Sequence, residues 1–135
     1  MTVRREYLRE AEALAPELIR LRQRLHRFPE LGNREVKTAA LIEEELHKLG
    51  IETRRLTETA ILGCLRCTED GPTVAFRADM DALPLTEATG APYASLNPGV
   101  THACGHDVHM TALLGAAKLL AARREQLHGS VCSTS

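Results

Sequence analysis

A stripe of apolar residues at helical spacing, followed at once by short β-prone runs, most limits the folds that this chain can adopt. The members of the stripe recur every three or four positions: Val36, Ala39, Ile42, Leu46 and Leu49. We expect a helix that begins at Asn33 as its N-cap and ends at Gly50 as its C-cap. One face of this helix should therefore belong to a core.

The other expected elements alternate between helical and extended patterns. They are a helix over 16–28 with Pro16 in its first turn, strands over 51–56, 60–67 and 73–76, an ordered loop over 82–101, and a helix from His106 or Asp107 to about Gln126. The mostly apolar run at 73–76 is typical of a central strand that is covered on both faces. This order of elements indicates an α/β layered fold in one domain at most.

The composition excludes several classes of protein. The chain has a net charge of −1 and no basic stripe with interleaved aromatic residues, so we expect no nucleic-acid partner. Its apolar runs are too short to span a bilayer, and its N-terminus lacks the apolar segment of a secretory signal. We therefore expect a cytoplasmic protein without a membrane partner. The 4 cysteines are sparse, which favours a reduced chain over a disulfide framework.

The segment 102–109 concentrates metal-binding side chains just before the last helix. It reads His-Ala-Cys-Gly-His-Asp-Val-His. Cys104 and His106 lie two positions apart in a glycine-containing turn, and both side-chain types bind zinc and related ions. One alternative is a buried cysteine with solvent-facing histidines, and another is a Cys104 nucleophile activated by His106. Taken singly, His102 and His109 are expected to be surface or hydrogen-bonded histidines.

Two acidic residues follow the strand expected at 73–76. Asp79 and Asp81 fall at the carboxyl end of this strand, where open α/β sheets gather their chemistry. We expect Asp81 to orient an imidazole ligand or a metal-bound water, and Asp79 to pair with Arg77 or to cap a turn. His26, on the first helix, is expected to be a hydrogen-bonded core residue or a cap.

Cys64 and Cys67 have the spacing of half a zinc site. We expect them instead to be small residues of a β-hairpin, placed on opposite faces of the sheet. The alternative is a small structural zinc module that combines both cysteines with Cys104 and His106.

Four motifs resemble, in this order, those of the metal-dependent amidohydrolases that act on N-acyl amino acids. They lie at 25–32 (Leu-His-x-x-Pro-Glu-Leu-Gly), 77–84 (Arg-Ala-Asp-Met-Asp-Ala-Leu-Pro), 95–109 (ending in His-Ala-Cys-Gly-His-Asp-x-His) and 114–118 (Leu-Gly-Ala-Ala-Lys). This branch includes hippurate hydrolases, auxin-conjugate hydrolases and N-acetyl-diaminopimelate deacetylases, and it is related to aminoacylase and carboxypeptidase G. The resemblance extends from about residue 17 to residue 129.

The resemblance implies that residues 1–135 form the first half of a zinc-peptidase-like catalytic domain. Its sheet would be mixed, flanked by helices and incomplete at the C-terminus, and the lid or dimerisation domain would be absent. The implied cofactor is a two-metal centre of zinc, manganese or cobalt, which activates water for attack on the amide bond of a small N-acyl amino acid. By motif, Cys104 and His106 are the implied metal ligands, and Asp81 is the carboxylate that supports the centre. Homo-oligomerisation is a further implication.

After residues 128–131 the chain departs from the family pattern, which continues into a strand ending in two glutamates, one a general base and one a ligand. Here the sequence reads Val131-Cys-Ser-Thr-Ser135, which we expect to be a polar tail without a strand. The general base would then be absent, and the sheet edge and the last helix would be partly uncovered. We expect a truncated chain that is inactive alone and marginally stable. The alternative function is binding to itself or to a full-length paralogue through the open sheet edge.

Overall fold

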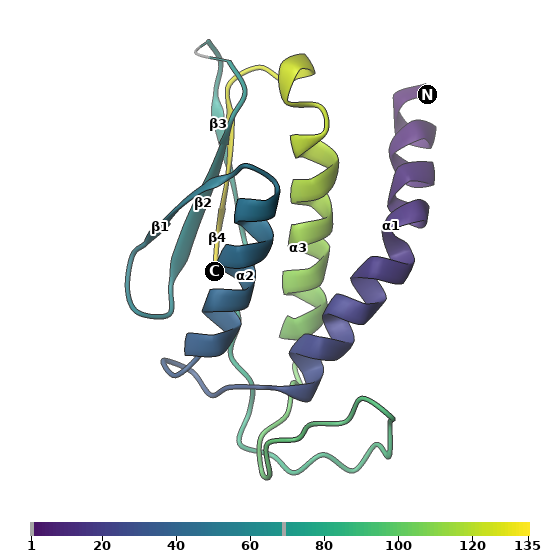
Figure 1. Cartoon of the computed structure of the whole chain (residues 1–135), viewed down its shortest axis with the longest axis vertical. Coiled ribbons are helices and arrows are strands. Elements are labelled where there is room, and N and C mark those ends of the chain that lie inside the picture. Colours follow the sequence, from purple (N-terminus) through teal and green to yellow (C-terminus); the bar gives the residue numbers. More distant parts are fainter. Residues whose placement is uncertain (1, 69) are drawn as a thin grey trace.

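The computed structural model describes residues 2–68 and 70–135, which form helices packed on one mixed sheet (Figure 1). The elements follow in the order α1 (Thr2–Arg27), α2 (Val36–Lys48), β1 (Glu52–Arg55), β2 (Ile61–Arg66), β3 (Thr73–Arg77), α3 (His106–Ala121), a 3₁₀ turn (Arg124–Gln126) and β4 (Ser130–Thr134). None of the described helices is long and apolar enough to cross a membrane. The predicted α/β class and mixed sheet are confirmed.

The strand order is β1-β2-β4-β3, so the last strand of the described chain lies inside the sheet. β2 pairs antiparallel with β1 and with β4, whereas β3 pairs parallel with β4. The prediction of a tail without a strand at 131–135 is therefore wrong. A short polar segment is held here because β4 has a backbone ladder on each side, and because the β-branched Val131 packs against the core.

β3 lies at the edge of the sheet rather than in its centre. All of its residues are exposed, and Val74 and Phe76 each retain 48% of their accessible surface. The prediction of a central strand covered on both faces is therefore wrong. A short apolar run does not reveal the order of strands, which here depends on pairing with β4 from the far end of the chain.

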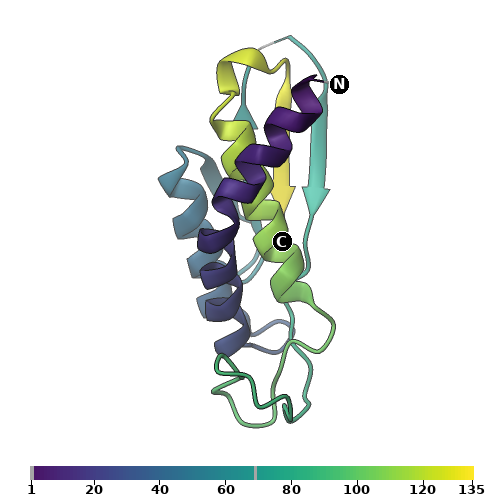
Figure 2. The same ribbon diagram turned by 90° about the vertical axis from the view of Figure 1, so that its right-hand side faces the viewer.

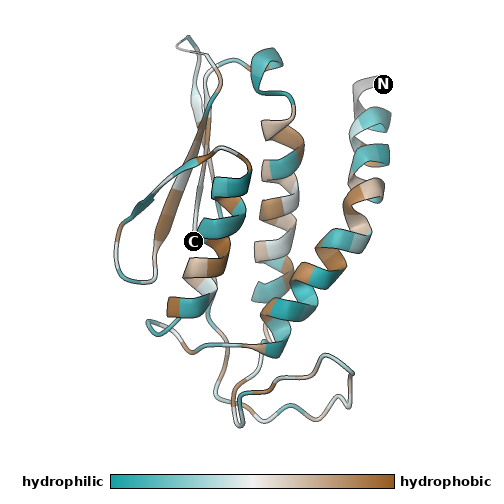
Figure 3. Ribbon diagram, in the orientation of Figure 1, coloured by the Kyte–Doolittle hydropathy of each residue, from teal (hydrophilic) through white to brown (hydrophobic). Residues whose placement is uncertain are grey.

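The helices cover one face of the sheet. α2 contacts β1 and β2, and α1 packs against α3. Figure 2 shows α1 in front, α3 behind it and the strands of the sheet farther back. Apolar and hydrophilic residues alternate along α1 and α2 (Figure 3), as expected for helices with one buried face. The core between the layers includes these nearly inaccessible side chains: Leu25, Leu46, Ile61, Met110 and Leu114.

Two helix boundaries differ from the sequence prediction. α1 continues through Pro16, because the fixed φ of proline is compatible with a helix. The axis of α1 changes direction along its length in Figure 1, because proline lacks the backbone N–H that would bond to the preceding turn. α2 begins only at Val36, since Asn33 adopts a left-handed conformation with a φ of 63°. The Glu30 carboxylate accepts hydrogen bonds from two N–H groups in the first turn of α2 (3.2 and 2.6 Å). The C-cap of α2 is Leu49, and Gly50, which was predicted to be the C-cap, follows it with a φ of 69°.

A disulfide joins Cys64 of β2 to Cys132 of β4. The two residues are direct partners in the antiparallel register, and their Cα atoms lie 4.1 Å apart. The expectation of a reduced chain is wrong, because strand pairing brings together two cysteines that are far apart in the sequence. Cys67 and Cys104 are free thiols. The alternative prediction of a structural zinc module is wrong as well, since the sulfur of Cys64 is bonded to Cys132.

Candidate metal centre

Three segments meet at one end of the molecule: the C-terminal turn of α1, the loop over 82–101 and the turn that leads into α3 (Figure 1). A bridge between Leu83 and Thr101 closes the base of the loop. The side-chain amide of Asn97 donates a hydrogen bond to the carbonyl of Pro29, which fixes the loop against the segment after α1 (2.6 Å). The loop is therefore ordered by specific contacts, as its prolines and glycines predicted.

Gly105 directs the chain from this region into α3. Its φ of 77° lies in the left-handed region, which glycine adopts without steric cost. His106 is consequently the first residue of α3, and Cys104 lies in the turn just before the helix. The two predicted ligands thus share one turn at the N-terminus of α3.

Asp81 supports the imidazole of His106. The His106 Nδ1 lies 2.9 Å from Oδ1 of Asp81 and 3.0 Å from the Asp81 backbone carbonyl oxygen. Both oxygens accept hydrogen bonds, so Nδ1 carries the proton and donates it. The lone pair of the ring then lies on Nε2, which is the arrangement found in metal-binding histidines that are oriented by a carboxylate. The structure therefore places Asp81 within hydrogen-bond distance of the imidazole of His106.

Cys104 and His109, which flank His106 in the sequence, both have exposed side chains. Cys104 is a free, exposed thiol, and the ring of His109 lies tilted on that of His106 with 5.7 Å between centroids. Among the residues that the structure describes, no three histidine, cysteine, aspartate or glutamate side chains converge as a set of metal ligands. The described part of the chain therefore offers the donors Cys104 and His106, with Asp81 behind the imidazole, and not a complete coordination shell.

His102 is buried without hydrogen-bond partners. It is 5% exposed, and neither of its ring nitrogens has a partner among the described atoms. The expectation of a surface or hydrogen-bonded residue is wrong. The pKa of His102 is lowered, mainly because burial disfavours the charged ring. A buried imidazole with free nitrogens, close in sequence to the turn that carries Cys104 and His106, is able to accept or donate a hydrogen bond.

His26 lies between two carboxylates. Its Nδ1 is 2.7 Å from Oδ2 of Asp107, and its Nε2 is 3.0 Å from Oε1 of Glu87. Each carboxylate thus contacts one nitrogen of the buried ring. Arg22 also donates to Asp107 (2.8 Å). The prediction that His26 is a hydrogen-bonded core residue is confirmed.

Glu87 organises the loop from inside. Its carboxylate accepts hydrogen bonds from the Thr89 hydroxyl (2.6 Å), from the Ser95 backbone N–H (2.6 Å) and from His26. These bonds favour the charged form and lower the pKa of Glu87 from 4.5 to about 2. Sequence reasoning missed this residue, since a glutamate in a loop rich in proline and glycine carries no local sign of burial.

Asp107 is the other member of this buried network that sequence reasoning missed. It is fully buried and holds His26 and Arg22, whereas the sequence suggested only that it opens α3. Asp79 instead accepts a hydrogen bond from Arg77 (2.5 Å), as predicted for a structural residue.

Comparison with known proteins gives the family of the chain. Residues 75–133 match the model of peptidase family M20/M25/M40. The N-acetyl-L-cysteine deacetylase of Bacillus subtilis is 44% identical over 119 residues, which cover 87% of this chain and 29% of that protein. The N-acyl-L-amino acid amidohydrolase of Geobacillus stearothermophilus is 42% identical over 127 residues, which cover 93% of this chain and 34% of that protein.

Solved structures give the same result. The YXEP protein of Bacillus subtilis, described as a dinuclear metal binding peptidase from the M20 family, is 41% identical with a TM-score of 0.86, and the match covers 91% of this chain and 35% of that one. The chain thus spans about a third of the length of these relatives. It belongs to peptidase family M20/M25/M40 and corresponds to the N-terminal part of the amidohydrolases in that family.

Proposed function

We propose that this chain supplies part of the metal centre of an amidohydrolase that cleaves N-acyl amino acids. Cys104 and His106 would be metal ligands, and Asp81 would orient His106. The observation that carries the proposal is the hydrogen bond from Nδ1 of His106 to Asp81, which leaves Nε2 free to bind a cation. The names of the relatives, a deacetylase of N-acetyl-L-cysteine and an amidohydrolase of N-acyl-L-amino acids, support the substrate class.

The donor set fits a divalent transition-metal ion. A thiolate and an imidazole nitrogen suit zinc and cobalt, and a manganese ion would need more oxygen ligands than these two residues give. The dinuclear relative supports a two-metal centre. A bound cation would lower the pKa of its water and polarise the amide carbonyl. The residues of this chain would hold the ion at the N-terminus of α3 and fix the tautomer of one ligand.

We further propose that residues 1–135 alone do not hydrolyse N-acyl amino acids. Two donors fill half of a tetrahedral shell, and the described residues offer no third ligand beside Cys104 and His106. Release of an amino acid from N-acetylcysteine or N-benzoylglycine by the purified chain would contradict this proposal. The cytoplasmic location remains a prediction.

Paramagnetic broadening by Mn²⁺ and Co²⁺ in NMR spectra tests the proposed ligands. We expect the amide signals of residues 104–106 to broaden first in the wild-type chain, and this effect to be lost in Cys104→Ser and His106→Ala. Asp81→Ala should weaken ion binding by about tenfold or more, because the imidazole loses its orienting partner. Cys67→Ser is the matched control, since it removes a free thiol outside the ligand turn. Broadening that is centred elsewhere, or that survives in both ligand variants, would exclude this site.

The exposed edge of β3 supports a second candidate function, which is pairing with another copy of this chain. β3 pairs with β4 on one side only, and its apolar residues Val74 and Phe76 are exposed. An unpaired apolar edge is a template for strand addition. Analytical ultracentrifugation of the wild type and of Val74→Lys tests this function, because an edge-paired dimer should dissociate in the variant. A wild-type chain that is monomeric at all concentrations would exclude it.

A further inference from the structure

We propose that the Cys64–Cys132 disulfide is a thiol-exchange site for small thiols that carry carboxylates. The two sulfurs join neighbouring strands β2 and β4, and both cysteines are partly exposed. The bond is therefore accessible to a reagent in solution. This proposal does not depend on the metal centre.

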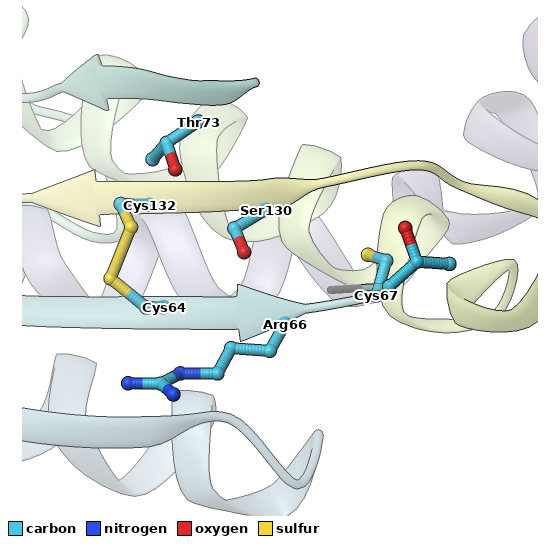
Figure 4. Close-up of a pocket in the computed structure, with 7 residues that line it drawn as sticks. Cys64, Arg66, Cys67, Thr73, Ser130 and Cys132 are labelled. Carbon is cyan, nitrogen blue, oxygen red and sulfur yellow. A yellow bond between two sulfur atoms is a disulfide. The ribbon is translucent and has the colours of Figure 1, made fainter. Parts of the chain in front are cut away.

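Two hollows flank the disulfide. The larger, of about 680 Å³, is lined by both cysteines together with Arg66, Thr73 and Ser130, among others (Figure 4). The smaller, of about 360 Å³, lies over β1 and β2 and is also lined by Cys64 and Arg66. Cys64 thus has an open space on each side of its strand. A nucleophile that attacks a disulfide needs this access, because it approaches the sulfur in line with the S–S bond.

The charges around Cys64 favour an anionic reagent. Arg66 lines both hollows, and in Figure 4 its side chain extends along the side of β2 that faces away from Cys132. Arg54 adds a second cation to the smaller hollow, and Glu52, the register partner of Cys64, adds one anion. Two guanidinium groups against one carboxylate leave this hollow positive, which attracts both a thiolate and the carboxylates of its carrier.

The proposed reaction is ordinary thiol–disulfide exchange. A small thiolate attacks Sγ of Cys64 from the smaller hollow and forms a new S–S bond, while the bond to Cys132 breaks and its Sγ leaves as a thiolate that takes a proton from water. A second small thiol then attacks the mixed disulfide and releases the free thiol of Cys64 together with the oxidised small disulfide. Two thiols are oxidised and one protein disulfide is reduced, so electrons balance.

Exchange should loosen the last strand. β4 is the strand neighbour through which β3 joins the sheet, and the disulfide is the covalent link between β4 and β2. Once the link is open, β4 is held by its backbone ladders and by the packing of Val131. Faster amide hydrogen exchange in β3 and β4 is the expected consequence.

The test uses the 135-residue chain in a Cys67→Ser/Cys104→Ser background, so that only Cys64 and Cys132 react. Reduced glutathione is the anionic probe and cysteamine the cationic one, and mass spectrometry with peptide mapping follows the mixed disulfide. We expect glutathione to react at Cys64 at least about threefold faster than cysteamine per thiolate, and Arg66→Gln to remove that preference. Arg20→Gln, an exposed arginine of α1, is the matched control and should keep it.

Several outcomes would overturn the proposal. They are two free thiols in the purified background protein, a disulfide that reacts only after denaturation, an adduct confined to Cys132, and equal rates for the two probes. Amide exchange in β3 and β4 that does not change after reduction would overturn the loosening of the strand.

Discussion

Replacement of Glu87 by glutamine tests the charged network around His26. The Glu87 side chain is 6% exposed and accepts hydrogen bonds from the loop and from His26. Its pKa falls from 4.5 to about 2, so the folded state prefers the ionised group. At 1.36 kcal/mol per pKa unit, this preference sets an upper limit of about 3 kcal/mol for the loss of stability at pH 7. Glutamine keeps the shape of the side chain but removes the charge.

The dependence on pH gives this prediction its sign. Because the folded-state pKa is depressed, the stabilisation by Glu87 is present above pH 4.5 and is lost as the pH falls toward about 2. The difference between wild type and Glu87→Gln should therefore shrink from at most about 3 kcal/mol at pH 7 to at most about 1.4 kcal/mol at pH 3.

Urea unfolding followed by circular dichroism at both pH values measures this difference. Glu125→Gln is the matched control, since Glu125 is exposed in the 3₁₀ turn, and it should change the free energy of unfolding by less than about 0.5 kcal/mol. A Glu87→Gln variant as stable as wild type at pH 7, or one whose deficit is the same at pH 3, would refute the argument that the charge of Glu87 stabilises the loop.

Two further substitutions test packing at named positions. Gly129→Ala should destabilise the chain by at least about 2 kcal/mol more than Gly99→Ala. Both residues have positive φ, but a Cβ at Gly129 would lie 2.1 Å from the Pro72 carbonyl oxygen, whereas a Cβ at Gly99 would meet open space. Equal thermal midpoints for the two variants would contradict this prediction. Met110→Ala should cost about 2–5 kcal/mol in chemical denaturation, since Met110 is 1% exposed. Val108→Ala on the same helix, where the side chain is 48% exposed, should have little effect, and a similar loss in both would contradict the assignment of Met110 to the core.

Local sequence patterns predicted the elements in which buried residues recur at a regular spacing. The stripe from Val36 to Leu49 gave α2 to within a few residues, and the β-prone runs gave β1 and β2. Helical periodicity reports which face is buried, and capping residues report where a helix ends. α3 ends at Ala121 rather than near Gln126, because the chain continues as a 3₁₀ turn that no periodicity separates from a helix.

The order of the strands could not be predicted in the same way. β3 and β4 are short, and whether a short segment lies at an edge or inside a sheet depends on its partners rather than on its own residues. Ser133, Thr134 and Ser135 suggested a solvated tail, yet backbone ladders on both sides hold Ser133 and Thr134 in the sheet. The disulfide was missed for the same reason, since it exists only where β4 lies beside β2.

The same distinction, between residues that are close in sequence and residues that only the fold brings together, applies to the candidate site. Cys104 and His106 could be placed together because two positions in one turn are close in any fold, and Asp81 because it follows a strand. The hydrogen bonds of His26 reach Glu87, which lies in the loop over 82–101, and Asp107 in α3, and no spacing rule connects these residues. The helix and sheet layers are held by aliphatic packing, whereas the end of the molecule that carries Cys104 and His106 is held by a buried imidazole between carboxylates. Such a network depends on geometry and on charge at once, so its members are the residues that sequence alone conceals most completely.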